Sequence, residues 1–342
     1  MPLNDIYHLL DPVALRLGPL EVRWYGLGYL AGFILGGIIA YTISKRWRVG
    51  LTKDDILNVL TGISLGVIIG ARLFYCLFYG DGYYLEHPLA ILALNEGGMS
   101  FHGGLVGAVV GGSIVCRREH ISIRTLTDIG VIAACPGIFL VRCANFVNGE
   151  LWGKETDLPW GVMFETGGNV YRHPSQLYEA FLEGIVMFII LWTLSKKMPP
   201  RPQMTFTGVF LAFYGICRIL IEFVRVPDAQ LGYLFGGFVT MGQCLSVPLL
   251  LGGVYLIWWA HRHNYPQVAY TDGRVVPDAT ELEEDRRWWD SMSCADWFGP
   301  RARSGASTRR RRSQRTSFWR SSTSPASPLQ ATTCRSCGIW SW

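Results

Sequence analysis

Residues 56–79 read ILNVLTGISLGVIIGARLFYCLFY, a long apolar stretch in which Arg72 is the one charged side chain. A helix of about 20 mostly apolar residues is long enough to cross the hydrocarbon core of a bilayer. Six further stretches of this kind are present, at 24–44, 98–116, 125–142, 176–195, 206–223 and 239–260. The sequence therefore predicts an all-α, polytopic membrane protein with seven transmembrane helices.

The composition of the whole chain agrees with this fold class. Half of the 342 residues are hydrophobic and only 17% are charged, whereas soluble domains carry about 25% charged residues. The formal net charge of +5 is unevenly placed: residues 293–342 hold nine arginines and one acid, giving +8, so the remainder carries 5 − 8 = −3. Nucleic-acid binding by the body of the chain is therefore not expected.

The orientation of the predicted spans follows from the basic residues in their connections. The second connection has no Lys or Arg, and the fourth and sixth have three between them. The first, third and fifth are basic and hold Lys45, Arg46, Arg48, Lys53, Arg117, Arg118, Arg124, Lys196, Lys197 and Arg201. Because basic connections stay in the cytoplasm, we expect the N-terminus outside and the C-terminus in the cytoplasm. The loop region at 143–175, between spans four and five, is then periplasmic.

The chain divides by composition into three parts. Residues 1–262 hold the seven predicted helices and form the membrane domain. Residues 263–292 are predicted to be a cytoplasmic linker, within which the acidic stretch 281–290 could form one short helix. Residues 293–342 are rich in Ser and Arg and lack periodicity, which predicts disorder. A frameshift at the end of the gene is an alternative origin for this tail.

Several charged side chains fall within or at the ends of the predicted spans, where a charge costs a few kcal/mol or more. Glu179 and Glu183 are four residues apart and share a helix face, as do Arg218 and Glu222. The full set is Arg72, Arg142, Glu179, Glu183, Arg218, Glu222 and Arg225. Most of these residues fall in the outward halves of their spans, which favours a functional site. A structural network that neutralises itself between helices is the alternative interpretation.

Two outward-facing motifs carry further polar groups. His102 lies in GGMSFHGG (97–104), at the mouth of the third span, although a lone histidine at a helix start is more often a capping residue. The stretch RCANFVNGELWG (142–153) combines a guanidinium, two amides and a carboxylate. This set suits a phosphate and its glycerol hydroxyls, with Arg142 as a bidentate donor and Glu150 orienting it. The G-x-S-x-G pattern at 62–66 lies inside an apolar helical stretch, so we do not assign it a nucleophile.

These motifs resemble the prolipoprotein diacylglyceryl transferase family over residues 5–262. The matching stretches are RWYG (23–26), GARLFY (70–75), SFHGGL (100–105), the 142–153 motif, RHPSQLYE (172–179), MGQ (241–243) and the residues Tyr214, Arg218, Glu222, Phe223, Arg225, Pro227 and Asp228. Val141 and Ala144 depart from the family, which usually has glycine there. The tail beyond about residue 290 has no counterpart.

The resemblance implies a reaction. The diacylglyceryl group of phosphatidylglycerol is transferred to the lipobox cysteine thiol of a prolipoprotein signal peptide. A thioether forms and glycerol phosphate leaves, in the first step of bacterial lipoprotein maturation. The implied location is the bacterial inner membrane, in contact with membrane lipids, and no metal or other cofactor is implied.

The same resemblance assigns roles to residues. Arg142 and Arg218 are expected to clamp the phosphate, and Asn145, Glu150, Gly153, Glu222 and Arg225 to complete the substrate site. His102 is the candidate general base because histidine titrates near working pH; Tyr25 and Tyr214 are second candidates, and the choice between His102 and Tyr214 stays open. A transporter and a non-catalytic lipid-binding scaffold are the alternative classes of function.

Overall fold

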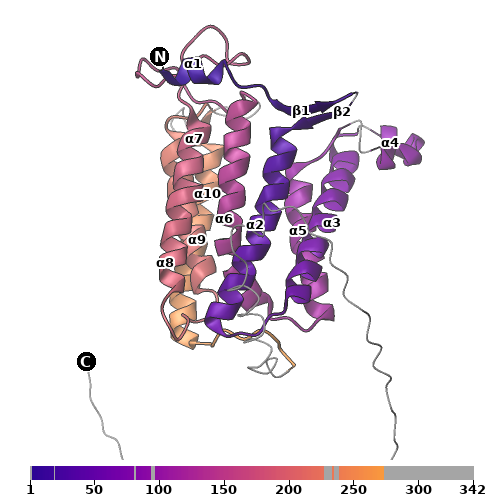
Figure 1. Ribbon diagram of the computed structural model, residues 1–342, viewed down its shortest axis with the longest axis vertical. Helices are drawn as coiled ribbons and strands as arrows, with labels where there is room; N and C mark the ends of the chain where they lie inside the picture. The colour runs from indigo at the N-terminus through magenta and orange to yellow at the C-terminus, as the bar shows by residue number, and fades with distance from the viewer. Residues whose placement is uncertain are drawn as a thin grey trace, which may run out of the picture. The chain divides into compact units, whose positions relative to one another are not determined.

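Six helices in the computed structural model are long and apolar enough to cross a membrane, judged by length and composition. The structure describes residues 2–18, 20–80, 82–93, 97–226, 233–234 and 239–272. The six helices run side by side (Figure 1) and are α2 (Trp24–Trp47), α3 (Lys53–Phe78), α6 (Ile123–Val147), the continuous helix Ser175–Ser195, α9 (Thr205–Glu222) and α10 (Met241–His263). The continuous helix consists of α7 (Ser175–Glu179), η3 (Ala180–Val186) and α8 (Met187–Ser195).

The remaining predicted span, 98–116, is also helical and corresponds to α5 (Phe101–Arg118). It is not among the six because glycines along its length and Arg117 and Arg118 at its end lower its hydropathy. The prediction of an all-α chain is wrong in detail, since two short pairs of antiparallel strands are present. Antiparallel β1 (Val13–Leu17) and β2 (Leu20–Arg23) form the first, and β3 (Tyr233–Leu234) and β4 (Val239–Thr240) form the second. The chain is therefore mostly helical.

Glycines bring the backbones of α3 and α5 into direct contact. A Cβ atom on Gly107 would overlap the carbonyl oxygen of Gly66, and a Cβ on Gly66 would overlap that of Gly107. The pair α2 and α6 is similarly close, because a Cβ on Gly32 would lie 2.9 Å from the Cα of Gly137. Small residues at fixed helical spacing permit this approach in lipid. These glycines therefore form helix-packing faces.

The main apolar core lies between α2, α6, α8 and α9. Ile43, Ile129 and Phe206 are fully buried there. The Trp47 ring lies 4.8 Å from the Phe206 ring, and its Nε1 donates a 3.1 Å hydrogen bond to the backbone oxygen of Ser195. The packing of this core fixes the relative heights of four helices, and so the height at which their polar residues meet.

Several connecting segments lie at the end of the helices where α2 begins (Figure 1). The segment 148–174 is held by short bridges, and α1 (Pro2–Tyr7) lies against it because the Tyr7 ring packs edge-on against Phe146 and Phe164. The helix α4 (Tyr83–Glu86) and the 3-10 helix η1 (Pro88–Leu92) follow α3 at this same end (Figure 1).

Residues 264–272 return along the helix ends after α10. The backbone N–H of Ser122 donates to the oxygen of Ala269 over 2.7 Å, the Tyr270 hydroxyl donates to Asp55 over 2.6 Å, and the Gln267 amide donates to Asp128 over 2.8 Å. The predicted linker 263–292 therefore begins as a docked segment. The rest of that linker, including 281–290, and the tail 293–342 lie outside the described residues.

Candidate active site

Two carboxylates four residues apart lie at a change of helix type. The helix from Ser175 is α-helical to Glu179 and π-helical over Ala180–Val186. Such wider turns occur frequently at functional sites. The π-helical turn lies against α6, since a Cβ on Gly184 would come 2.7 Å from the Cβ of Phe139. The close approach brings Glu179 and Glu183 to the end of α6, where Arg142 is located.

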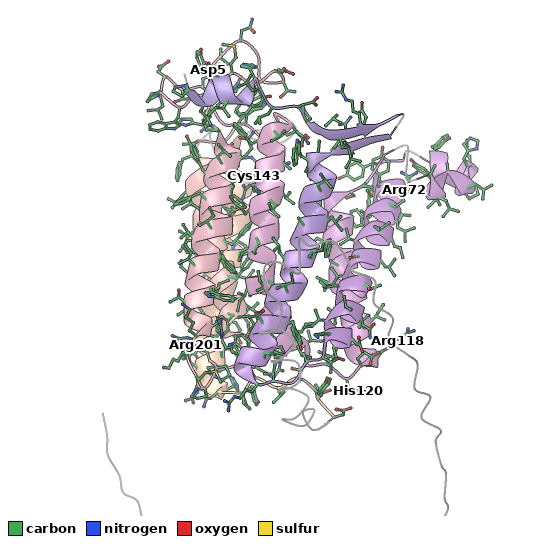
Figure 2. All side chains as sticks on the ribbon, viewed as in Figure 1. Asp5, Arg72, Arg118, His120, Cys143 and Arg201 are labelled. Atoms are coloured by element: carbon green, nitrogen blue, oxygen red, sulfur yellow. The ribbon has the colours of Figure 1, made fainter. Side chains whose placement is uncertain are left out.

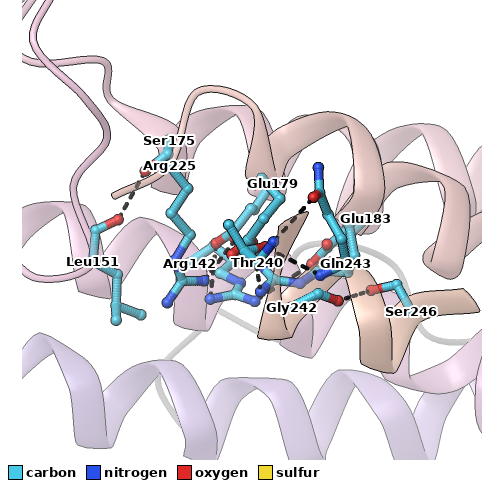
Figure 3. A network of polar contacts seen from close by, with 12 residues as sticks. Arg142, Leu151, Ser175, Glu179, Glu183, Arg225, Thr240, Gly242, Gln243 and Ser246 are labelled. Atoms are coloured by element: carbon cyan, nitrogen blue, oxygen red, sulfur yellow. Dashed lines mark hydrogen bonds and ion pairs between the residues drawn. The ribbon is translucent and has the colours of Figure 1, made fainter. Parts of the chain in front are cut away.

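Three arginines, one from α6, one from α9 and one just beyond α9, converge on Glu179, and Figure 3 shows Arg142 and Arg225 beside it. The Glu179 carboxylate lies 2.8 Å from Arg142 Nη1, 2.5 Å from Arg218 Nη1 and 3.3 Å from Arg225 Nη1. Two other carboxylates complete the network: Glu183 lies 3.5 Å from Arg142 Nη2 and Glu222 lies 3.4 Å from Arg218 Nη2. Glu179 is therefore the centre of the network.

Burial separates the two kinds of charge. The side chains of Glu179 and Glu183 are 1% and 0% exposed, whereas those of Arg142, Arg218 and Arg225 are 13–17% exposed. The three arginine side chains are therefore the more accessible partners of these two buried carboxylates. A guanidinium has five N–H donors in a planar fork, and one or two contacts with carboxylates leave others for an incoming anion.

Four residues of the predicted substrate site, Arg142, Arg218, Glu222 and Arg225, lie in this network. One predicted pairing is absent. Glu150, predicted to orient Arg142, instead accepts a 3.0 Å hydrogen bond from the Asn148 amide. It is exposed in the turn that begins at Gly149, where φ is +67°, so it leaves the line of α6. Asn145 stays in α6 and is buried.

Gly153 connects the 148–174 segment to the end of α9. Its N–H donates to the oxygen of His173 over 2.8 Å, and it forms a β-bridge with Arg225. A Cβ at this position would lie 2.6 Å from the oxygen of Val224 and 2.7 Å from the Cβ of His173. Only glycine fits between these two chains. Gly153 thus sets the backbone position of Arg225.

The three candidate bases lie on different helices. Tyr214 is one turn before Arg218 in α9 and within electrostatic range of Arg142 and Glu183. Tyr25 lies at the start of α2, its hydroxyl 3.3 Å from that of Tyr29, which is within electrostatic range of Arg142. His102 is exposed in the first turn of α5, which packs on α3. Of the three, Tyr214 shares a helix with Arg218 and lies within electrostatic range of the network.

Arg72 differs from the other intramembrane arginines. Its buried guanidinium donates to the backbone oxygens of Ala90, Ile91, Ala93, Gly97 and Gly98 over 2.5–3.1 Å. All of these acceptors lie in the segment that joins α3 to α5. A structural role in holding that segment accounts for the charge.

Sequence reasoning noted Glu179 and Glu183 as intramembrane charges but did not place them among the site residues. Their spacing of four residues was the available signal. The missing information was the identity of their partners, which come from α6, from α9 and from the third residue after its end.

The fold and this site define a class: a multi-pass helical membrane protein with a half-buried cluster of arginines and glutamates near one end of its helices. The family model for prolipoprotein diacylglyceryl transferase matches residues 12–259. The chain belongs to that family. It is a transferase, and the family carries out the first step of lipoprotein maturation.

Individual relatives agree with this assignment. The chain is 51% identical over 245 residues to the phosphatidylglycerol–prolipoprotein diacylglyceryl transferase of Geobacter sulfurreducens, covering 72% of this chain and 93% of that protein. The enzymes of the same name from Oleidesulfovibrio alaskensis and Aliivibrio fischeri are 45% and 46% identical, over 75% and 76% of this chain and 96% and 93% of theirs.

Proposed function

We propose that the arginine network holds the phosphate of phosphatidylglycerol while a lipobox cysteine of a prolipoprotein signal peptide displaces it. One observation carries this proposal: three arginine side chains converge on the buried Glu179 through their guanidinium groups, and these side chains are themselves partly exposed. A phosphodiester is an anion that a planar fork of donors binds well. The substrates named for the relatives supply such a group.

The chemistry requires charge stabilisation at the leaving group. The cysteine thiolate attacks the methylene carbon that bears the phosphate, so a carbon–sulfur bond forms as the carbon–oxygen bond breaks. The departing glycerol phosphate takes the electron pair and gains a negative charge, which the Arg142 and Arg218 guanidiniums offset. The thiol proton passes to a base of this chain. A free thiol titrates near pKa 8.5, so a base beside it raises the thiolate fraction.

The remaining roles follow from position. Glu179 aims the arginines, Arg225 and Glu222 complete the cluster, and Gly153 sets the position of Arg225. Asn145 and the exposed Glu150 are assigned to the glycerol headgroup, because both lie just beyond Arg142 in the chain. For the base, Tyr214 lies within electrostatic range of the network, while histidine is the residue type that ordinarily titrates nearest to neutral pH.

The same proposal includes a topology. We assign α5 as a seventh span because its whole length packs along α3 through backbone contact. Arg118, His120 and Arg201 lie at one end of the helices and Cys143, beside Arg142, toward the other (Figure 2). By the distribution of basic residues, the first end is cytoplasmic and the network lies near the periplasmic face of the bacterial inner membrane. Both substrates are amphiphiles, so they would enter from the side, through the bilayer.

The test is transfer of diacylglyceryl to a lipobox peptide by the full chain in phosphatidylglycerol-containing nanodiscs. Arg142→Ala and Arg218→Ala should each abolish the thioether product while the protein still inserts. Arg117→Ala, at the other end of the helices, is the control and should retain activity. Full activity in either network variant would remove the phosphate-clamp proposal, and solute flux through liposomes without product would indicate a transporter instead.

A further inference from the structure

The first turn of α10 lies against the carboxylate of Glu222. A Cβ atom added to Gly242 would lie 2.7 Å from the Cδ and Oε1 atoms of Glu222 and 2.8 Å from its Oε2. In proteins a Cβ atom essentially never lies within 3.0 Å of a heavy atom from a residue that is not its chain neighbour. The carboxylate therefore occupies the space that any side chain at Gly242 would need. Figure 3 shows Gly242 beside the arginine network.

This turn is held in place by its own hydrogen bonds. The Gln243 N–H donates to Thr240 Oγ1 over 3.3 Å, and the Thr240 N–H donates to the Gln243 side-chain oxygen over 3.2 Å. The Ser246 hydroxyl also donates to the backbone oxygen of Gly242 over 2.6 Å. Such a reciprocal cap fixes the start of a helix. Because the turn is braced in this way, a clash at Gly242 would move Glu222 rather than α10.

The start of α10 also complements the charge of Glu222. The first N–H groups of a helix lack partners within the helix, and the helix dipole places partial positive charge there. Glu222 is 5% exposed and its Oε2 is 3.4 Å from Arg218 Nη2. Part of the negative charge of Glu222 is therefore offset by the helix end. The charge of Arg218 is then less completely offset by Glu222 and attracts an approaching anion more strongly.

We propose that Gly242 is a positioning residue for the transfer reaction: its lack of a side chain seats the Glu222 carboxylate on the N-terminus of α10, and Glu222 in turn directs the Arg218 guanidinium toward the lipid phosphate. The inference rests on the proposed function of Arg218. It adds the start of α10 to the machinery of the site, although no residue of that turn carries a charge.

The first experiment compares two glycines of the same helix in the full chain. Gly252 has no heavy atom within 4 Å of an added Cβ, so Gly252→Ala is the matched control for Gly242→Ala. We expect Gly242→Ala to lower kcat/KM for phosphatidylglycerol by about 10- to 100-fold, as displacement of a clamp by a fraction of an ångström to one ångström does. Gly252→Ala should stay within about twofold of the wild type. Wild-type activity in Gly242→Ala would overturn the inference.

The second experiment asks whether Gly242 acts through Glu222. Binding of phosphatidylglycerol is measured for Gly242→Ala, Glu222→Ala and the double variant, so loss of turnover does not hide the result. Once the carboxylate is absent, Gly242→Ala should cause no further loss of affinity. An equal loss in both backgrounds would mean that Gly242 acts elsewhere, and the inference would fail.

Arg218→Ala separates this inference from the proposed function. If that variant binds and turns over phosphatidylglycerol like the wild type, the proposed function fails. If it is inactive while Gly242→Ala matches the wild type, only the inference about Gly242 fails. The thermal unfolding midpoints of the two glycine variants, recorded in the same nanodiscs, show whether a loss of activity accompanies a loss of folding.

Discussion

Replacing Glu179 with Gln keeps the shape of the side chain and removes the charge at the centre of the network. Glu179 lies within 3.3 Å of three guanidinium groups, whereas Glu183 and Glu222 each contact one, at 3.5 and 3.4 Å. The same substitution at the three glutamates therefore differs mainly in how many arginines lose their partner. We predict that Glu179→Gln is the most damaging of the three.

The expected magnitude follows from the number and depth of the contacts. At an effective dielectric of about 20, a pair of unit charges 4 Å apart attracts by about 4 kcal/mol. Removing one partner of a buried pair costs about 3–5 kcal/mol in stability. Glu179 is 1% exposed and its loss also leaves Arg142, Arg218 and Arg225 repelling one another. We therefore expect at least about 4 kcal/mol for Glu179→Gln, and less for Glu222→Gln.

The effect on catalysis should be larger than the effect on folding. Displacement of a positioned group by about 1 Å can reduce the rate about 100-fold, and here three groups move together. Transfer to a lipobox peptide and thermal unfolding in nanodiscs are measured for the three glutamine variants. If Glu179→Gln is no worse than Glu222→Gln in both assays, Glu179 is not the centre of the site and the geometry above does not describe the active enzyme.

Three further outcomes are expected. Gly107→Ala should lower the thermal unfolding midpoint through an overpacking cost of about 1–3 kcal/mol. Gly104→Ala, whose Cβ would make ordinary 3.6 Å contacts, should leave the midpoint unchanged. Equal midpoints for the two variants would contradict backbone contact between α3 and α5. Burial lowers the pKa of His173, so the unfolded chain binds more protons than the folded one and the free energy of unfolding should fall as pH drops below about 6.5. His173→Gln should flatten that decline between pH 7 and pH 5.5. An unchanged slope would exclude His173 as its source. A chain ending at 272 should keep full activity because the docked segment remains, whereas one ending at 262 should unfold at lower temperature; identical midpoints would show that the hydrogen bonds of 264–272 are dispensable.

The sequence by itself determined the class of the protein and singled out several of the charged residues that meet in the network. Apolar stretches of bilayer length are local properties, and six of them appear as helices of spanning length and composition, with α5 as a less apolar, glycine-rich companion. Charges in such stretches are costly, so Arg142, Arg218 and Glu222 could be singled out without knowledge of their neighbours. The motif resemblance then indicated the family, which the comparisons confirm.

The tertiary structure decided which charges meet. Arg142 and Glu179 are far apart in the chain, and only the packing of α6 against the π-helical turn brings them within 2.8 Å. The same packing leaves Glu150 outside the arginine network, although it lies much closer to Arg142 in sequence, and gives Arg72 a purely structural set of acceptors. Helical periodicity reports which face a residue occupies, but a partner on another helix depends on how close and at what height the two backbones pack. Here that height is set by buried side chains and by glycines, whose effect no local pattern contains.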